Sequence, residues 1–225
     1  DVKNALKENR KRVKLKSLSM HIGSNFLKLA ELGSAMNILE NHFSEFLNEG
    51  FEIDRLDLGG GLGIDYHNYD IQKDESLIAD YADLLKSLHE RHPKIQLMLE
   101  PGRILIARSA ILITQVQYIK KNGSTWFAVV DTGMNHLLRP ALYEAHHQIW
   151  PLLNRQSEKK AMSVAGPICE STDILATNVQ LAIHEDDCLA ILDCGAYGMS
   201  MASHYNLHDF PLEYYFENGK ISHLA

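Results

Sequence analysis

The sequence predicts parallel α/β structure in residues 1–107 and a mainly β part in residues 108–225. Three observations support this division. Short apolar segments alternate with amphipathic helical patterns up to about residue 105, as is typical of a parallel sheet. Beyond that point, strand-like segments follow one another across turns that contain Gly, Asn or Pro. Polar, glycine-containing segments stand at the ends of predicted strands, where parallel sheets bind their ligands.

In the first part, the basic residues 1–16 predict a solvated helix end. A helix that stops at Gly50 is predicted next, from apolar residues at three- and four-residue steps. These residues are Leu32, Met36, Leu39, Phe43 and Phe46. Residues 53–58 are predicted to form a short strand. The same spacing predicts a second helix, with Leu77, Tyr81, Leu84 and Leu88 on one side and Pro93 beyond its end. Residues 95–99 are apolar except for Gln96, which predicts a strand covered on both faces.

In the second part, strands are predicted over residues 111–119, 125–130, 161–165, 188–193 and 212–216. Only residues 169–181 have a partly helical pattern.

The composition and charge of the chain argue against several classes of function. The chain has 225 residues, 45% of them hydrophobic and 23% charged, as expected of a soluble globular protein. A formal charge of −7 argues against nucleic acid or an acidic membrane surface as a partner. No apolar run approaches the length of a membrane span, and the first residues lack signal-peptide character. The three cysteines have no zinc spacing, so we expect no metal site and a cytoplasmic setting.

Four segments stand out at the predicted strand ends: His-Ile-Gly-Ser at 21–24, Gly-Gly-Gly-Leu-Gly at 59–63, Glu-Pro-Gly-Arg at 100–103 and Gly-Pro-Ile-Cys-Glu at 166–170. The glycine run lets backbone N–H groups approach an anion closely. It is neither a Walker loop nor the dinucleotide fingerprint, because the residues that follow do not match either pattern. For the glycines alone, a tight turn between strand and helix is an equally good explanation.

The other segments add groups of different chemistry. Glu100 could keep a heteroaromatic nitrogen protonated, and Arg103 could hold a phosphate or carboxylate by two parallel bonds. Taken alone, the two are better explained as a structural ion pair across a turn. His21 could stack on an aromatic ring and Ser24 could bond a phosphate oxygen, although a lone histidine is more often structural. Together with a thiol at Cys169, however, these groups describe a site for pyridoxal phosphate.

These segments resemble the fold-type III pyridoxal-phosphate-dependent decarboxylases, and the likeness extends over nearly the whole chain. It includes Asp-Thr-Gly-Met-Asn at 131–135, Arg-Pro-Ala-Leu-Tyr at 139–143, Cys-Glu-Ser-Thr-Asp at 169–173, Gly-Ala-Tyr-Gly at 195–198 and Tyr-Asn at 205–206. Two runs, Arg-Pro-Ala-Leu-Tyr at 139–143 and Gly-Pro-Ile-Cys-Glu-Ser at 166–171, are typical of the family's diaminopimelate branch. The chain departs from the family pattern at Ser17 and Ser19 and in the stretch after Asn206.

The resemblance implies a fold and an activity. The fold is the C-terminal part of an alanine-racemase-like (β/α)8 barrel followed by a β domain. The activity is decarboxylation of meso-2,6-diaminopimelate to L-lysine, the last step of lysine biosynthesis, by a homodimer with shared active sites.

The resemblance also implies a role for each matching residue. At the cofactor, His21 stacks on the pyridine ring, Glu100 pairs with its nitrogen, and the phosphate is held by Ser24, Gly59, Gly60, Gly61, Gly102 and Arg103. At the substrate, the distal carboxylate is held by Arg103, Arg139 and Tyr143, and the distal ammonium by Glu170. Tyr197 touches both phosphate and substrate, and Cys169 protonates the carbon that loses carbon dioxide. A cysteine is more often a small buried hydrophobe, but the position of Cys169 beside Glu170 favours a functional role.

The resemblance also exposes an absence. The family's Schiff-base lysine belongs to an early barrel strand, and only about twenty residues precede His21 here, whereas a closed barrel needs eight strands. We therefore expect the chain to be part of a longer enzyme. Two alternatives remain: a non-catalytic homologue without that lysine, and a decarboxylase of ornithine, arginine or carboxynorspermidine. Arg139 argues against ornithine, which has no distal carboxylate, and the full substrate set argues against a regulator.

Overall fold

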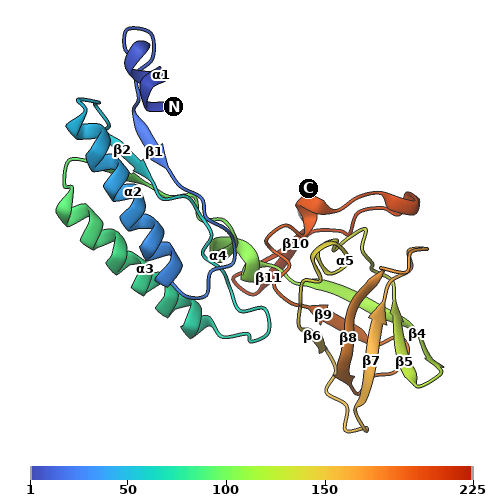
Figure 1. The fold of residues 1–225 in the computed structure, drawn as a ribbon. Helices are drawn as coiled ribbons and strands as arrows, with labels where there is room; N and C mark the ends of the chain where they lie inside the picture. Colours follow the sequence, from blue (N-terminus) through green and yellow to red (C-terminus); the bar gives the residue numbers. More distant parts are fainter. Residues whose placement is uncertain (1, 224–225) are drawn as a thin grey trace. The chain divides into compact units, whose positions relative to one another are not determined.

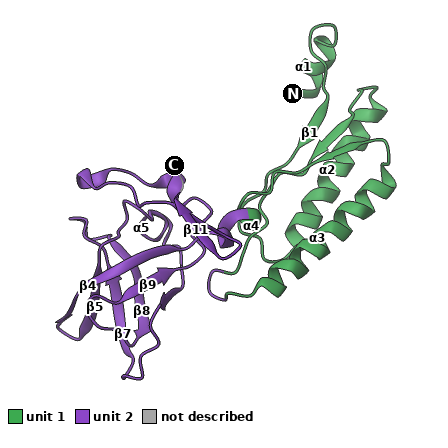
Figure 2. Cartoon of the chain, turned by 180° about the vertical axis from the view of Figure 1, so that it is seen from behind, with its two compact units in different colours: residues 1–65, 69–105 green, residues 66–68, 106–225 purple. Residues whose placement is uncertain are grey.

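The computed structural model describes residues 2–223, so Asp1 of the predicted basic helix end and the last two residues of the predicted β part lie outside it. The chain forms two compact units (Figure 2). The first contains residues 1–65 and 69–105, and the second contains residues 66–68 and 106–225. Within residues 2–223, no helix is both long enough and apolar enough to cross a bilayer.

The first unit is a small parallel α/β structure (Figure 1). Its elements are α1 (Val2–Glu8), β1 (Ser17–Ser19), α2 (Ala30–Asn48), β2 (Arg55–Asp57), α3 (Ile71–Arg91), β3 (Gln96–Met98) and the start of α4 (Arg103–Ile106). The strands pair in the order β1-β2-β3, and both pairings are parallel. Because successive strands are joined through α2 and α3, their carboxyl ends meet at one edge of the sheet.

The two long helices confirm the predicted periodicity. The five apolar residues predicted to form one face of α2 are all buried, and they pack with Leu56 and Leu58 in one cluster. Beyond α2, Gly50 has φ 77°, a left-handed conformation that glycine adopts without strain. At the start of α3, the Asp70 side chain accepts a hydrogen bond from the Lys73 N–H. The solvated helix at the N-terminus is also confirmed, since α1 has no buried residue.

The prediction that residues 95–99 form a strand covered on both faces was wrong in its second half. These residues do form β3, but Met98 and Leu99 are 39% and 40% exposed. Within the described residues β3 pairs only with β2, so it is an edge strand here.

The second unit is built on a six-stranded sheet with the order β6-β9-β4-β5-β7-β8. Its elements are β4 (Leu112–Asn122), β5 (Thr125–Val130), α5 (Arg139–Tyr143), β6 (Ile149–Pro151), β7 (Lys160–Ala165), β8 (Ile174–Leu181), β9 (Cys188–Ile191), β10 (Tyr214–Glu217) and β11 (Lys220–His223), with short 3-10 turns at Ala107–Ser109, Met199–Met201 and Tyr205–Leu207. The β5–β7 pairing is parallel and the others are antiparallel. β10 and β11 form a separate hairpin. The predicted fold class, parallel α/β structure followed by a mainly β part, is confirmed.

One predicted element of this unit was wrong. Residues 169–181 are not helical: they form a loop and then β8, which pairs antiparallel with β7. Asn178 has φ 57° and the β7–β8 register shifts twice, so the apolar residues of β8 do not follow a strict period of two. Leu175 and Leu181 are buried in the core, which shows that tertiary pairing overrides the local helical pattern.

Candidate active site

The first three predicted segments lie together at one edge of the parallel sheet. His21 and Ser24 follow β1, the glycine run follows β2, and residues 100–103 follow β3. Backbone hydrogen bonds join neighbouring segments, from Met20 N to Asp57 O at 3.0 Å and from Glu100 N to Gly59 O at 2.9 Å. The sequence places these segments up to 82 positions apart, and the parallel register brings them together.

The glycine run is required by close packing of the backbone. A Cβ atom on Gly59 would lie 2.2 Å from Met20 O, and one on Gly60 would lie 2.3 Å from Glu100 O. Gly61, with φ 106°, would place a Cβ 2.7 Å from Gly23 O. Within the described part of the chain, the N–H groups of Gly60 and Gly61 have no hydrogen-bond acceptor. A half-buried amide pair of this kind is suited to bind an anion.

A hydroxyl and a guanidinium meet at the same edge. Arg103 Nη2 donates to Ser24 Oγ at 3.0 Å. A Cβ atom on Gly102 would meet nothing within 4 Å, so the backbone beside Arg103 is open on that side. His21, Ser24 and Glu100 are exposed in this chain.

This donor set fits pyridoxal phosphate. Glycine amides, a hydroxyl and a guanidinium are donors for a phosphate. A carboxylate and an imidazole on the neighbouring segments suit a protonated ring nitrogen and an aromatic face.

Apart from Arg103, the predicted substrate residues lie in the second unit, and Arg139 is the most constrained of these. It begins α5 and is only 7% exposed. Its Nη1 is 2.9 Å from His147 Nε2, and its guanidinium carbon lies 4.7 Å from the Tyr66 ring centre and 5.7 Å from that of Tyr197. The guanidinium is therefore held between two aromatic rings and one imidazole.

Cys169 and Glu170 are exposed residues of a loop that the side chain of Asp173 holds in place by hydrogen bonds to the backbone. Asp173 is 2% exposed, and its carboxylate accepts from the N–H groups of Met134 at 2.6 Å and Ile168 at 2.7 Å. Burial raises the pKa of Asp173, and the two amide hydrogen bonds act in the opposite direction. The loop that carries Cys169 and Glu170 is thus anchored at both its start and its end.

The Glu170 carboxylate has a hydrogen-bond donor in Tyr205. The Tyr205 hydroxyl donates to Glu170 Oε1, and this hydrogen bond raises the pKa of Tyr205. All three cysteines are free thiols, but they differ in environment. Cys169 is exposed, whereas burial raises the pKa of the Cys194 thiol to about 12. Cys169 is therefore the most accessible of the three thiols, since Cys188 is half-buried.

The structure groups the predicted site residues in two sets. His21, Ser24, the glycines, Glu100 and Arg103 share the sheet edge of the first unit, and Arg139 and Tyr197 meet in the second. Tyr143 ends α5 and is 64% exposed. Sequence reasoning did not single out His147 or Tyr66, and it gave Asp173 no role. No local pattern marks them, since each acts through residues distant in sequence or through the backbone.

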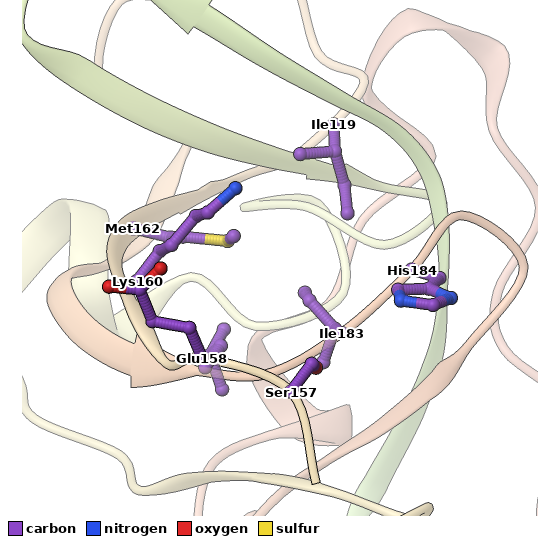
Figure 3. Close-up of a pocket in the computed structure, with 8 residues that line it drawn as sticks. Ile119, Ser157, Glu158, Lys160, Met162, Ile183 and His184 are labelled. Atoms are coloured by element: carbon purple, nitrogen blue, oxygen red, sulfur yellow. The ribbon is translucent and has the colours of Figure 1, made fainter. Parts of the chain in front are cut away.

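Two pockets of the second unit are lined by residues other than the predicted site residues. One of about 320 Å³ is lined by residues of β4, β7 and β8, of the loop before β7 and of the loop after β8, including Glu158, Lys160 and His184 (Figure 3). It contains none of the predicted site residues. A second, of about 570 Å³, is lined by Pro140, Ser171 and Thr172 among others. Pro140 follows Arg139 in sequence, and Ser171 follows Glu170. Among residues 2–223, no group of three or more His, Cys, Asp or Glu side chains could hold a metal ion.

Comparison with known proteins gives one consistent answer. A family model described as "Pyridoxal-dependent decarboxylase, C-terminal sheet domain" matches residues 33–195. Diaminopimelate decarboxylase of Aquifex aeolicus is 40% identical over 227 residues, covering 98% of this chain and 53% of the relative. The enzyme of Haemophilus influenzae is 38% identical over 195 residues, covering 86% and 46%. The chain spans about half the length of these curated relatives.

Solved structures agree. Diaminopimelate decarboxylase of Helicobacter pylori complexed with L-lysine superposes with a TM-score of 0.84 at 36% identity, over 98% of this chain and 55% of that one. The enzyme of M. jannaschii in co-complex with L-lysine gives a TM-score of 0.88 at 32% identity, over 99% and 52%.

Proposed function

The chain belongs to the pyridoxal-dependent decarboxylase family, and from this premise we propose that it is the C-terminal part of a diaminopimelate decarboxylase. The proposed reaction converts meso-2,6-diaminopimelate to L-lysine and carbon dioxide with pyridoxal phosphate as cofactor. The relatives that carry this name support the proposal, as do the two solved structures that bind L-lysine.

At the cofactor end, Ser24, Arg103 and the amides of the glycine run hold the phosphate. Glu100 pairs with the ring nitrogen and His21 stacks on the ring. Bound pyridoxal phosphate supplies an electron sink for the electron pair left when carbon dioxide departs, provided that the ring nitrogen stays protonated. Glu100 lies two residues beyond the end of β3, and its carboxylate would accept a hydrogen bond from the protonated ring nitrogen.

At the substrate end, one observation carries the choice of diaminopimelate. Arg139 is a buried cation, and within residues 2–223 the groups that contact its guanidinium, the side chains of His147, Tyr66 and Tyr197, are not anions. Its positive charge is therefore available to bind the distal carboxylate of the substrate, to which Arg103 and Tyr143 are also assigned. Glu170 offers the opposite charge for the distal ammonium. A site that holds both charges rejects amino acids without a distal zwitterion, because its own charges would be left unpaired.

Cys169 donates the proton that replaces the lost carboxylate. Its Sγ is exposed on a loop that Asp173 anchors, and Tyr197 completes the surroundings of the phosphate and the substrate.

The reaction itself tests the proposal. The full-length protein, loaded with pyridoxal phosphate, should show the visible absorbance of the bound cofactor, release carbon dioxide from meso-diaminopimelate and form L-lysine in equal amount. Carbon dioxide from ornithine, arginine or carboxynorspermidine at the same rate would contradict the substrate assignment. Absence of any bound chromophore after reconstitution would contradict the cofactor assignment.

We further propose that the enzyme is a homodimer in which Cys169 of one subunit completes its neighbour's site. The surface of the second unit supports an interface, since Leu207, Leu212, Phe216 and Ile221 are 95%, 71%, 74% and 72% exposed. Mixing full-length Cys169→Ala protein with a variant that lacks the Schiff-base lysine tests the sharing of sites. Mixed dimers should recover up to about one functional site in two. No recovery despite subunit exchange would assign Cys169 to its own subunit.

A cytoplasmic setting completes the proposal, because an exposed free thiol at Cys169 persists in a reducing compartment. Cell fractionation with detection of the protein tests this, and recovery in an oxidising compartment would contradict it.

A further inference from the structure

His147 is a buried histidine with a partner on each ring nitrogen. It lies in the segment between α5 and β6 and is 1% exposed. Its Nε2 is 2.9 Å from Arg139 Nη1, and its Nδ1 is 2.8 Å from the backbone oxygen of Leu192. The Tyr66 ring packs against the imidazole in a T-shaped arrangement, with 5.1 Å between ring centres. All four residues belong to the second unit.

The two partners determine the chemical state of the imidazole. A guanidinium has only donors, so Nε2 must accept from Arg139 through its lone pair. A backbone carbonyl only accepts, so Nδ1 must carry the proton and donate to Leu192. His147 is therefore neutral and fixed as the Nδ1–H tautomer. A protonated imidazole would lose the acceptor and place a second positive charge against Arg139.

A neutral acceptor has a particular consequence for its partner. A carboxylate at this position would orient Arg139 equally well but would also neutralise its charge. An imidazole orients the guanidinium and leaves its full positive charge for another anion. The rings of Tyr66 and Tyr197 act in the same way, because they pack on the guanidinium without adding a negative charge.

We propose that His147 is the positioning residue that fixes the Arg139 guanidinium for the carboxylate at the distal end of the substrate. This inference rests on the proposed function, which assigns that carboxylate to Arg139. His147 acts through Arg139 and takes no part in the chemistry at the reacting carbon.

The competing explanation is that His147 only fills the core. Three substitutions separate the two explanations. His147→Gln places a neutral amide oxygen near the position of Nε2 and so retains an acceptor for Arg139. The side chain in His147→Glu has nearly the same shape as that in His147→Gln, but its acceptor is an anionic carboxylate. His147→Asn keeps a donor for Leu192 and withdraws the acceptor from Arg139.

Two ligands give a readout that does not depend on turnover. L-lysine carries an amino-acid head, and pentane-1,5-diamine is the same molecule without the carboxylate. Dissociation constants for both are measured by calorimetry on the full-length protein loaded with pyridoxal phosphate. His92→Asn serves as a control, since it removes a partly buried imidazole that contacts Glu40 at 2.7 Å in the first unit. Thermal unfolding of every variant monitors the fold.

Loss of a hydrogen bond to a charged group predicts a lysine affinity about 10- to 100-fold weaker in His147→Asn. Neutralisation of Arg139 predicts a loss of about 10-fold or more in His147→Glu. His147→Gln should stay within about 3-fold of the wild type. Affinity for pentane-1,5-diamine should change less than about 2-fold in every variant, and His92→Asn should alter neither ligand.

Equal weakening in the Gln and Glu variants, or equal weakening of lysine and the diamine, would overturn the inference and leave His147 a core residue. The Gln and Glu pair decides this even where the Asn variant does not fold. A wild-type protein that binds no lysine and releases no carbon dioxide from meso-diaminopimelate would instead overturn the proposed function, and the inference with it.

Discussion

Replacing Arg139 with Met should remove the preference for diaminopimelate while leaving the fold largely intact. Met has a similar length and fills the space between the Tyr66 and Tyr197 rings without a charge. Arg139 is 7% exposed, so an ion pair about 4 Å long in a medium of effective dielectric about 20 is worth about 4 kcal/mol. This agrees with the range of about 2–5 kcal/mol for truncating one partner of a buried charge pair.

That range corresponds to a loss of about 30- to 5,000-fold in kcat/KM for meso-diaminopimelate. The assay compares kcat/KM for meso-diaminopimelate with that for ornithine, which lacks a distal carboxylate. We expect the first value to fall and the second to change little, so the ratio between them collapses. Arg155→Met is the matched control, because Arg155 is an arginine of the same unit that donates to the Asp187 carboxylate at 2.7 Å and 2.5 Å.

The control should lose stability and keep the preference. An Arg139→Met protein that folds and retains most of its preference for meso-diaminopimelate would refute the reasoning. In that case the distal carboxylate would be bound by other groups, and the burial of Arg139 would be a matter of packing alone.

Three further predictions concern the cofactor edge and the stability of the second unit. Glu100→Gln should keep part of the cofactor binding but lower kcat by about 100-fold or more, because a neutral ring nitrogen is a poor electron sink. Absorbance titration measures the cofactor binding and steady-state kinetics measure kcat. An unchanged kcat would contradict the role of Glu100. Gly60→Ala should weaken cofactor affinity, since its Cβ would lie 2.3 Å from the backbone oxygen of Glu100. A dissociation constant for the cofactor equal to that of the wild type would contradict this prediction. The hydrogen bond from Arg155 lowers the pKa of Asp187 to about 2, from 3.8. Its contribution to stability is therefore complete above pH of about 5 and lost as the pH falls towards 2. With Arg155 a third exposed, the contribution is about 1–2 kcal/mol. Urea unfolding of wild type and Asp187→Asn across this pH range measures it, and parallel pH profiles would contradict it.

The elements that local patterns specify could be predicted from the sequence. The five apolar residues of α2 and the stop at Gly50 are a property of one helix and its end, and they do not depend on distant partners. β8 could not be predicted in this way, because its pairing with β7 and the irregular residue Asn178 decide its conformation. The exposure of Met98 and Leu99 depends on which strands lie beside β3, which the local sequence does not encode.

Some features of the candidate site could likewise be predicted from the sequence, and others could not. Residues at the ends of parallel strands could be expected to meet, and the 3.0 Å contact of Ser24 with Arg103 joins residues 79 positions apart. The surroundings of Arg139 could not be expected. His147 is one of twelve histidines, and its role depends on a backbone oxygen 45 positions away. Tyr66 belongs to the second unit although the residues before it belong to the first.

A competition experiment tests the central claim most directly. Full-length protein loaded with pyridoxal phosphate is given equal concentrations of meso-diaminopimelate, ornithine, arginine and carboxynorspermidine, and the products are identified by mass spectrometry. We expect L-lysine to form first and the amines from the other three substrates to appear only after diaminopimelate is exhausted. Putrescine, agmatine or norspermidine forming at a rate equal to that of L-lysine would contradict it.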